Sequence, residues 1–317
     1  MNYYLSTKID KLNIIALMQQ VYPAYSYNET FFDWQYTKNP YKKAKIFVAE
    51  KEGKIIGMYA CVPHIILKNN KTYPIWRVQE VMIHADYRKQ GIFEGLMAYA
   101  QNRIHWSYKD IFWAFPNEKS FSHFLKQGFF IHSKVIFWEY KTEDKTTNIS
   151  LSYDIKEKQN FDFIQENRYL FLVKSENKYL NLLKEEKYLT WRYIQKNKEA
   201  YFIYTIYKNK ELKGYMVIKK YINKENESSL HICELQAIND EIEIIESLLF
   251  FAITQKKKHN TEILNTFASS FNMEIALKNL FFVSKQTDKN IVFWAADSSK
   301  KEIASKIRFS LGDNDIF

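Results

Sequence analysis

The pattern of apolar and polar positions first predicts a β-hairpin near the start of the chain. Residues 45–67, KIFVAEKEGKIIGMYACVPHIIL, alternate in character and are interrupted at Glu52-Gly53-Lys54, where glycine suits a turn. Further along, β-branched runs alternate with stretches whose apolar positions recur at helical spacing. These patterns predict a strand at 77–83, a helix from Ile92, a strand at 111–115, a helix at 118–127 ended by Gly128, and a strand at 129–140.

An internal repeat extends this prediction to the second half. Trp34 and Trp191 are separated by 157 positions, as are Gly57 and Gly214, and further matches follow in the same order. They pair Leu125-Lys126 with Leu277-Lys278 and Phe137-Trp138 with Phe293-Trp294. The repeat predicts an α+β protein of two duplicated units, 1–148 and 149–317, each a twisted mixed sheet flanked by helices. The polar residues 142–152 are predicted to form the junction.

Composition narrows the class of protein. In 317 residues, 46% hydrophobic and 26% charged residues are typical of a globular chain, and no run of about 18 apolar residues predicts a membrane span. Cys61 and Cys233 provide neither a disulfide framework nor a metal-binding spacing, so we expect no metal and a reducing, cytoplasmic compartment. The net charge of +10 favours anionic ligands. Because no clustered basic helix or zinc motif occurs, nucleic acid is the least favoured of them.

The segment that carries candidate chemistry joins the strand at 77–83 to the helix that follows. Its loop and first helical turn contain Arg88, Lys89, Gln90, Gly91, Ile92 and Phe93. A helix N-terminus presents backbone N–H groups without intrahelical partners and a partial positive charge. A tight loop with glycine there suits a pyrophosphate, and Arg88 and Lys89 would add charge. The structural alternative is an ordinary solvated basic turn. Gly95 is expected where the helix packs on the sheet.

These residues resemble the acetyl-CoA loop of the GNAT acetyltransferase superfamily, which has the pattern Arg/Gln-x-x-Gly-x-Gly/Ala after a strand. Arg88 and Gly91 match the pattern, and Phe93 stands where the family has a small residue. Asn117 and Gly128-Phe129 are similar to a later segment of the family. The resemblance covers about residues 30–140 and implies a GNAT fold that uses acetyl-CoA as acyl donor.

The resemblance also implies roles for the backbone and for one asparagine. In the family the strand before the loop splays from its neighbour, which implies that Met82, Ile83 and His84 hold the pantetheine arm and the thioester. Asn117 would lie near the pantetheine, and its structural alternative is a helix N-cap.

Acyl transfer to an amine also needs a base and an acid. Glu80 lies where some relatives place a carboxylate that accepts the amine proton, and a salt bridge with Arg77 or Arg103 is its structural alternative. Phe124 stands where the family has the tyrosine that acts as general acid. The candidates that remain for the acid are His123, Tyr99 and His84, and the thiolate could also leave unaided.

The second unit is predicted to be a degenerate copy. Residues 231–251, HICELQAINDEIEIIESLLFF, carry Glu234 on the strand and acidic residues at the positions of the basic loop. Carboxylates that face a pyrophosphate repel it, so the second unit is predicted to complete the core and shape the acceptor pocket. In the C-terminal tail, Asp313 and Asp315 could attract an ammonium group but are expected in solvent.

The function predicted from these features is acetyl-CoA-dependent N-acetyl transfer to a primary amine of a small molecule, with an amino sugar or sugar nucleotide as candidate. FemABX-like aminoacyl transferases also pair two GNAT-like units and take aminoacyl-tRNA, although the Arg-x-x-Gly loop favours CoA. A non-catalytic acyl-CoA-binding protein is the second alternative, because it would tolerate Phe93 and Phe124 at their positions. No signature in the sequence fixes the acceptor, the acyl length or the oligomeric state.

Overall fold

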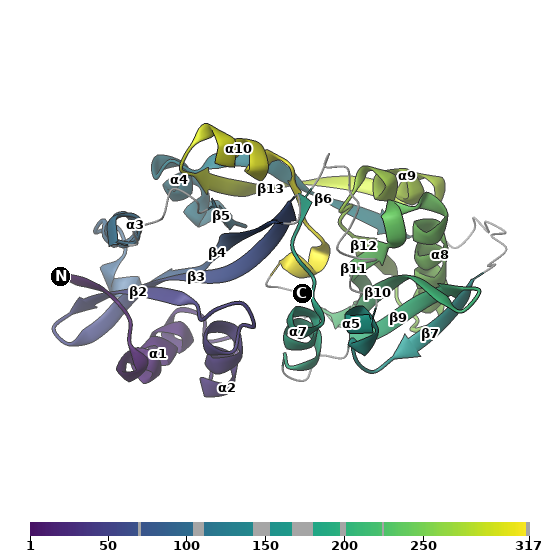
Figure 1. Cartoon of the computed structure of the whole chain (residues 1–317). Coiled ribbons are helices and arrows are strands. Elements are labelled where there is room, and N and C mark those ends of the chain that lie inside the picture. Colours follow the sequence, from purple (N-terminus) through teal and green to yellow (C-terminus); the bar gives the residue numbers. More distant parts are fainter. Residues whose placement is uncertain are drawn as a thin grey trace. The chain divides into compact units, whose positions relative to one another are not determined.

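A computed structural model describes residues 1–68, 71–103, 111–141, 153–166, 180–196, 201–223 and 225–314 (Figure 1). The chain forms two compact units, neither of which is a contiguous half of the sequence. Unit 1 comprises Met1–Lys134, Gln195–Asn197 and Lys289–Ser305, and unit 2 comprises Val135–Ile194, Lys198–Asp288 and Lys306–Phe317. The boundary predicted between 148 and 149, and the junction predicted at 142–152, lie outside the described residues.

The sheet of unit 1 has the strand order β1-β2-β3-β4-β5-β13, in which β4 and β5 pair in parallel and the other neighbours pair antiparallel. The strands are β1 (Asn2–Leu5), β2 (Lys45–Lys51), β3 (Lys54–Lys68), β4 (Lys71–Ile83), β5 (Ile111–Ala114) and β13 (Val283–Ala295). The helices are α1 (Lys11–Val21), α2 (Glu29–Phe32), α3 (Ile92–Arg103), α4 (Glu118–Lys126) and α10 (Ser298–Ser305). Short helical turns are η1 (Lys8–Asp10), η2 (Asp33–Thr37) and η3 (Ala85–Tyr87).

The sheet of unit 1 is covered on both faces, because successive side chains of a strand point to opposite sides. On β2, Ile46 and Val48 pack into a core with α1 and α2, whereas Phe47 and Ala49 pack into a second core with α3 and α4. The predicted hairpin and the predicted helix from Ile92 are both confirmed. The loop between β4 and α3 therefore follows the end of an interior strand, in a sheet whose two faces are covered by packed helices.

The sheet of unit 2 has the order β6-β12-β11-β10-β9-β7, and again one inner pair, β11 with β12, is parallel. The strands are β6 (Phe130–Tyr140), β7 (Asp154–Lys158), β9 (Tyr201–Lys208), β10 (Glu211–Ile222), β11 (Ser228–Ala237) and β12 (Ile263–Thr266). A separate parallel pair joins β8 (Leu180–Asn181) to β14 (Ile307–Arg308). The helices and turns are α5 (Asp162–Glu166), α7 (Glu186–Leu189), η4 (Thr190–Ile194), η5 (Ile238–Asp240), α8 (Ile242–Lys258), α9 (Phe271–Asn279) and η6 (Leu311–Asp313).

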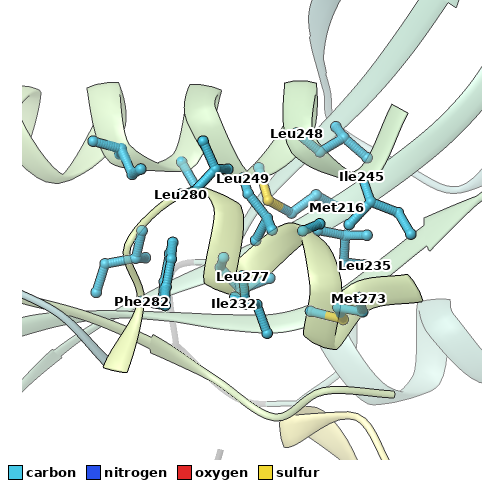
Figure 2. Packing of buried hydrophobic residues seen from close by; sticks show 14 of the residues in the cluster. Met216, Ile232, Leu235, Ile245, Leu248, Leu249, Met273, Leu277, Leu280 and Phe282 are labelled. Carbon is cyan, nitrogen blue, oxygen red and sulfur yellow. The ribbon is translucent and has the colours of Figure 1, made fainter. Parts of the chain in front are cut away.

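The core of unit 2 lies between this sheet and the helices α8 and α9. Figure 2 shows Leu248 and Leu249 of α8 and Leu277 of α9 meeting Met216 and Ile232 from the strands. All five side chains are buried. No helix among the described residues is long and apolar enough to cross a membrane.

The predicted duplication is confirmed element by element. Each unit has a short helix that passes into a π-helical turn bearing the repeated tryptophan, Trp34 in η2 and Trp191 in η4. A hairpin, a third strand, a helix, a parallel strand and another helix follow in both. The closing strands are exchanged: β13 pairs with β5 in unit 1, and β6 pairs with β12 in unit 2. Each sheet is thus completed by a strand from the other half of the sequence.

Candidate functional site

The loop between β4 and α3 has a backbone shape that few sequences adopt. Lys89 has φ +61° and Gly91 has φ +73°, both in the left-handed region that side chains other than glycine rarely enter. The first helical hydrogen bond runs from Gly95 N to Gly91 O, at 2.9 Å. The N–H groups of the residues just before Gly95 therefore have no helical acceptor and lie at the positive end of α3. This arrangement suits an anion.

The two glycines of the segment serve different purposes. A Cβ atom added to Gly91 would meet no atom within 4 Å, so its positive φ is what demands glycine there. A Cβ atom added to Gly95 would lie 2.3 Å from Tyr3 Oη on β1. The prediction that Gly95 sits where the helix packs on the sheet is confirmed.

Strands β4 and β5 separate beside this loop. Their parallel pairing covers Ile75 to Arg77 on β4, whereas β4 continues to Ile83. His84 N donates to Ile56 O of β3, at 2.8 Å. Because neighbouring residues of a strand present their backbone groups to opposite edges, those of Ile83 face the side on which β5 has diverged. An extended ligand can hydrogen-bond to such an edge as an additional strand would.

The side chains around the loop bond back to its own backbone. Arg88 Nε donates to Ile83 O at 3.1 Å, and Gln90 Nε2 donates to Asp86 O at 3.2 Å. His84 caps η3, with its Nδ1 accepting from Asp86 N at 3.4 Å. Of the predicted donor-binding residues, Met82 is buried, and Arg88, Lys89 and Gln90 are exposed. Arg88 and Lys89 add two positive charges to the loop, which also carries Asp86.

Phe93 turns inward at the start of α3. Its ring packs 4.9 Å from that of His123 and 5.9 Å from that of Phe124 on α4, measured between centroids. His123 Nδ1 lies 2.6 Å from Glu94 Oε1, so α3 and α4 share a histidine–carboxylate pair next to the loop. Burial by itself raises the Glu94 pKa, but a backbone hydrogen bond and the contact with His123 outweigh it and leave that pKa lowered. Phe124 is buried in the core.

Asn117 is the N-cap of α4, and its place near the pantetheine stays a prediction. Its side chain accepts from Ser120 N at 3.0 Å and so caps the first turn of α4.

Glu80 lies at a bulge in β4. Met58 pairs with Met82 and Ala60 pairs with Gln79, so Tyr59 of β3 faces both Glu80 and Val81. Glu80 has φ +50° and is half-buried, and Tyr27 Oη donates to its Oε1 over 3.4 Å. Arg77, one salt-bridge partner predicted for Glu80, donates to Gln79 Oε1 and lies over the Trp113 ring. The other, Arg103, has a side chain outside the described residues.

Sequence reasoning missed the aromatic residues that lead to Glu80. Tyr22, Tyr25 and Tyr27 follow α1, and Phe31 lies in α2. Neighbouring rings along this series have centroids 6.0, 5.8 and 5.1 Å apart. The spacing Y-x-x-Y-x-Y was visible in the sequence, but its relation to Glu80 depends on a contact between residues far apart in the chain.

The C-terminal tail was predicted to be solvated, and for Asp313 this is wrong. Asp313 is 1% exposed and forms an ion pair with Lys184, whose Nζ also lies 2.8 Å from Glu234 Oε1. Tyr193 Oη donates to the same Glu234 oxygen at 2.6 Å. Buried charges persist when they are paired and hydrogen-bonded, so this cluster anchors the tail within unit 2. Asp315 lies outside the described residues.

The counterpart of the basic loop in unit 2 differs in charge and in bonding. Asp240 Oδ1 accepts from Ser270 Oγ at 2.7 Å, and Ser270 is the N-cap of α9. Glu241 stands at the N-cap of α8 and Glu243 in its first turn. These carboxylates already occupy the favourable place for negative charge at the helix N-terminus. Among the described residues, no group of three His, Cys, Asp or Glu side chains could hold a metal ion in either unit.

Comparisons with known proteins agree with this geometry. The family profile for an acetyltransferase (GNAT) domain matches residues 6–126. The fold is similar to that of a GCN5-related N-acetyltransferase from Anabaena variabilis, with a TM-score of 0.71 and 15% identity over 93% of this chain and 73% of that one. A tandem GNAT protein from the clavulanic acid biosynthesis pathway gives a TM-score of 0.61 and 12% identity over 93% and 98%.

A third similar structure is N-myristoyltransferase from Saccharomyces cerevisiae, determined with bound myristoyl-CoA and inhibitors. Its TM-score is 0.59, with 12% identity over 92% of this chain and 79% of that one. A search of curated proteins found no match. The predicted resemblance and the predicted fold class, with its tandem arrangement, are both confirmed.

Proposed function

We propose that the chain, whose residues 6–126 match the family profile for an acetyltransferase (GNAT) domain and which has the fold of GNAT acyltransferases, is an acetyl-CoA-dependent N-acetyltransferase of a small-molecule primary amine. The observation that carries the proposal is the loop before α3, in which the left-handed Lys89 and Gly91 precede a helix N-terminus beside a splayed pair of strands. Acetyl-CoA would bind at this loop as the acyl-donor substrate.

The residues of the loop fit such a donor. A pyrophosphate would be held by the first backbone N–H groups of α3, including those of Ile92 and Phe93, with Lys89 supplying positive charge. The pantetheine arm would extend along the edge of β4 that β5 leaves, where the Ile83 N–H can donate while Ile83 O accepts from Arg88, and so bring the thioester towards Glu80. Asn117, which caps α4, would lie near this arm.

Glu80 is our candidate for the base. An amine attacks as the neutral species, and its ammonium form loses a proton to a carboxylate at the site or to a water held by it. The left-handed backbone at Glu80 is a strained conformation that the bulge in β4 maintains, and such strain concentrates at functional positions. The attack forms the C–N bond, and the C–S bond of the thioester breaks.

His123 is our candidate for the acid that protonates the leaving thiolate. Its Nδ1 is engaged by Glu94, which fixes the ring and leaves Nε2 as the atom that can deliver a proton. Tyr99, another predicted candidate, packs against Tyr3 and Phe47. His84 caps η3. His84 Nδ1 also lies near a carboxylate, 3.7 Å from Asp86 Oδ2, but His123 is the candidate whose carboxylate, Glu94, lies within hydrogen-bond distance of the ring.

The proposal is tested by thiol release from acetyl-CoA in the presence of a panel of amines that includes amino sugars and sugar nucleotides. We expect amine-dependent release by the native chain and none by Gly91→Asp, which places a carboxylate beside the phosphates. Gly53→Asp is the matched control, because Gly53 has φ +74° and equally open surroundings at a hairpin turn. Release that survives in Gly91→Asp, or that is lost equally in Gly53→Asp, would contradict the proposal.

A further inference from the structure

The two units carry the same carboxylate at the same point of the sheet. Gly57 pairs with Ile83 in unit 1, and the repeated Gly214 pairs with Ala237 in unit 2. Counting three residues back along each third strand gives Glu80 and Glu234. The two glutamates are therefore structural counterparts, and what one of them binds is informative about the other.

In unit 2 this carboxylate holds an ammonium group. Lys184 Nζ lies 2.8 Å from Glu234 Oε1 and 5.3 Å from the centroid of the Tyr188 ring. Tyr193 Oη donates to the same carboxylate oxygen. Lys184 also pairs with Asp313, so this primary ammonium is bound by two carboxylates and by an aromatic face, which are the groups that attract an organic cation.

The residue that supplies this ammonium is replaced in unit 1. Lys184 precedes Trp191 by seven positions, and Tyr27 precedes Trp34 by seven. Both residues contact the counterpart glutamate, since Tyr27 Oη donates to Glu80 over 3.4 Å. A phenol is neutral, so at this position unit 1 carries a hydrogen-bond donor where unit 2 carries a cation. The aromatic face is retained, because Phe31 is the counterpart of Tyr188.

Four aromatic rings lie in consecutive contact between the exposed surface and Glu80. We call them the aromatic strip: Tyr22, Tyr25, Tyr27 and Phe31. Tyr25 is 61% exposed and Tyr22 is 38% exposed, whereas Tyr27 is 9% exposed. Gln19 Nε2 donates to Tyr27 O at 2.7 Å and fixes the inner end of the strip. Large exposed aromatic side chains in a row commonly mark a surface that binds a ligand.

We propose that the acceptor binds as a primary ammonium on Glu80, with its carbon body lying along the aromatic strip, in the way that Lys184 binds Glu234 within unit 2. The acceptor class is a monoamine with an apolar or ring-shaped body and no anionic group next to the amine. An adjacent carboxylate or phosphate would be repelled by Glu80 and by the negative faces of the rings. This inference rests on the proposed function and names the acceptor of the same site.

The first test measures binding without turnover. Calorimetry with 2-phenylethylamine, as its ammonium ion, is compared with 2-phenylethanol and with phenylalanine, each with and without saturating free CoA. We expect the ammonium ion to bind at least about tenfold more tightly than the neutral alcohol and the amino acid, as desolvated cation contacts of this kind allow. Equal affinities, or no binding of the amine under either condition, would overturn the inference.

The second test introduces into unit 1 the lysine that unit 2 carries at the counterpart position. Tyr27→Lys should place a lysine on Glu80 and abolish binding of 2-phenylethylamine, with CoA affinity unchanged. Tyr25→Ala should weaken that binding by about tenfold through loss of one aromatic face. Tyr221→Ala, at a tyrosine of unit 2 that is 40% exposed, is the matched control and should leave binding unchanged. Undiminished amine binding in Tyr25→Ala would overturn the inference even if Tyr27→Lys failed to fold.

These measurements separate this inference from the proposed function. If acetyl transfer occurs but favours amines with an adjacent anionic group, the function stands and the acceptor class is wrong. If 2-phenylethylamine binds at Glu80 but no amine in a panel is acetylated, the binding site stands and the proposed reaction is wrong.

Discussion

At the scale of single residues, Glu80 combines a half-buried carboxylate with a left-handed backbone. Glu80→Gln keeps its shape and hydrogen bonding but removes its basicity, so we expect kcat to fall by about 10²–10⁴ with CoA affinity unchanged. The rate should recover partly as pH rises, because solution then supplies the neutral amine.

A matched control for this variant exists in the same unit. Glu52 has φ +54° and is exposed at the β2–β3 turn, so Glu52→Gln should leave kcat unchanged across the same pH range. A Glu80→Gln protein that retains native kcat throughout would make Glu80 a spectator. One that unfolds would make it a structural group.

The contact between His123 and Glu94 leads to a second prediction. If His123 protonates the thiolate, His123→Gln should lower kcat with acetyl-CoA by about 10²-fold or more, since general acids contribute that much. An aryl thioester, whose thiolate leaves without help, should reduce the difference between native and variant rates. His132→Gln, at a histidine of β6, serves as control. An equal loss with both thioesters would mean that His123 acts only in packing α3 against α4.

Much of the loop between β4 and α3 could be predicted at this scale, because the residues that identify it are adjacent in sequence. Gly91 and the charges beside it are adjacent in sequence, and a strand followed by glycine and a helix is a pattern that a single segment encodes. The partner of Glu80 and the burial of Asp313 could not be predicted in the same way. Both depend on contacts between residues far apart in the chain, Tyr27 with Glu80 and Lys184 with Asp313.

At the scale of elements, the closing strand β13 completes the sheet of unit 1 although it comes from the second half of the sequence. Val292 is fully buried in the core beneath α3 and pairs with Ala114 of β5. Val292→Ala should cost about 2 kcal/mol of unfolding free energy through lost burial and the cavity left behind. Hydrogen exchange at the amides of β5 should accelerate accordingly. Val283→Ala on the same strand, at a side chain 68% exposed, should have little effect.

The exchange of closing strands is a feature that periodicity alone did not predict, because the sequence pattern named no partner for either strand. A strand was predicted at 129–140, its counterpart around Phe293-Trp294 was indicated by the repeat alone, and the similar sequences Phe137-Trp138 and Phe293-Trp294 suit either sheet. Alternation sets which face of a strand is buried, but not which neighbour it pairs with. The choice of partner is made by tertiary packing.

The buried ion cluster of unit 2 predicts a pH-dependent stability. Lys184→Met leaves Glu234 and Asp313 buried without their ammonium, which should cost about 3–5 kcal/mol near pH 7. Burial already raises the Glu234 pKa, and removal of the ammonium raises it further. A raised native pKa contributes stability below the unfolded pKa, about 4.3 for Glu, and that stability is lost as pH rises through the native value.

The loss in Lys184→Met should therefore be smallest near the unfolded pKa of Glu and grow towards neutral pH, as followed by denaturant unfolding. Lys213→Met removes an ammonium that lies 2.7 Å from the exposed Glu211 and should change stability by less than about 0.5 kcal/mol at any pH. A pH-independent loss in Lys184→Met would mean that packing of the lysine stem, not charge, holds the tail.

At the scale of the whole molecule, duplication has produced two units of one topology with different charge at the same places. Unit 1 presents Arg88 and Lys89 before α3, whereas unit 2 presents Asp240 and Glu241 before α8. In unit 2 the carboxylate of the third strand, Glu234, is paired with Lys184 of the same unit. The architecture was predictable from the repeat. The divergence of the second copy was predictable from its charges. The burial of the C-terminal tail in unit 2, through the ion pair of Asp313 with Lys184, was not.

This divergence predicts that a single CoA binds per chain. A phosphate approaching the N-terminus of α8 would meet the carboxylates of Asp240, Glu241 and Glu243. The Coulomb repulsion from these three full negative charges should outweigh the attraction of the partial positive charge at the helix N-terminus. Calorimetric titration of the native chain with CoA should therefore fit one site of normal stoichiometry. Gly91→Asp should remove that site completely, whereas Asp240→Asn should leave its affinity and stoichiometry unchanged. Two sites in the native chain, or residual binding in Gly91→Asp, would mean that unit 2 accepts a phosphate despite its carboxylates, and the assignment of the donor to the loop of unit 1 would fail with it.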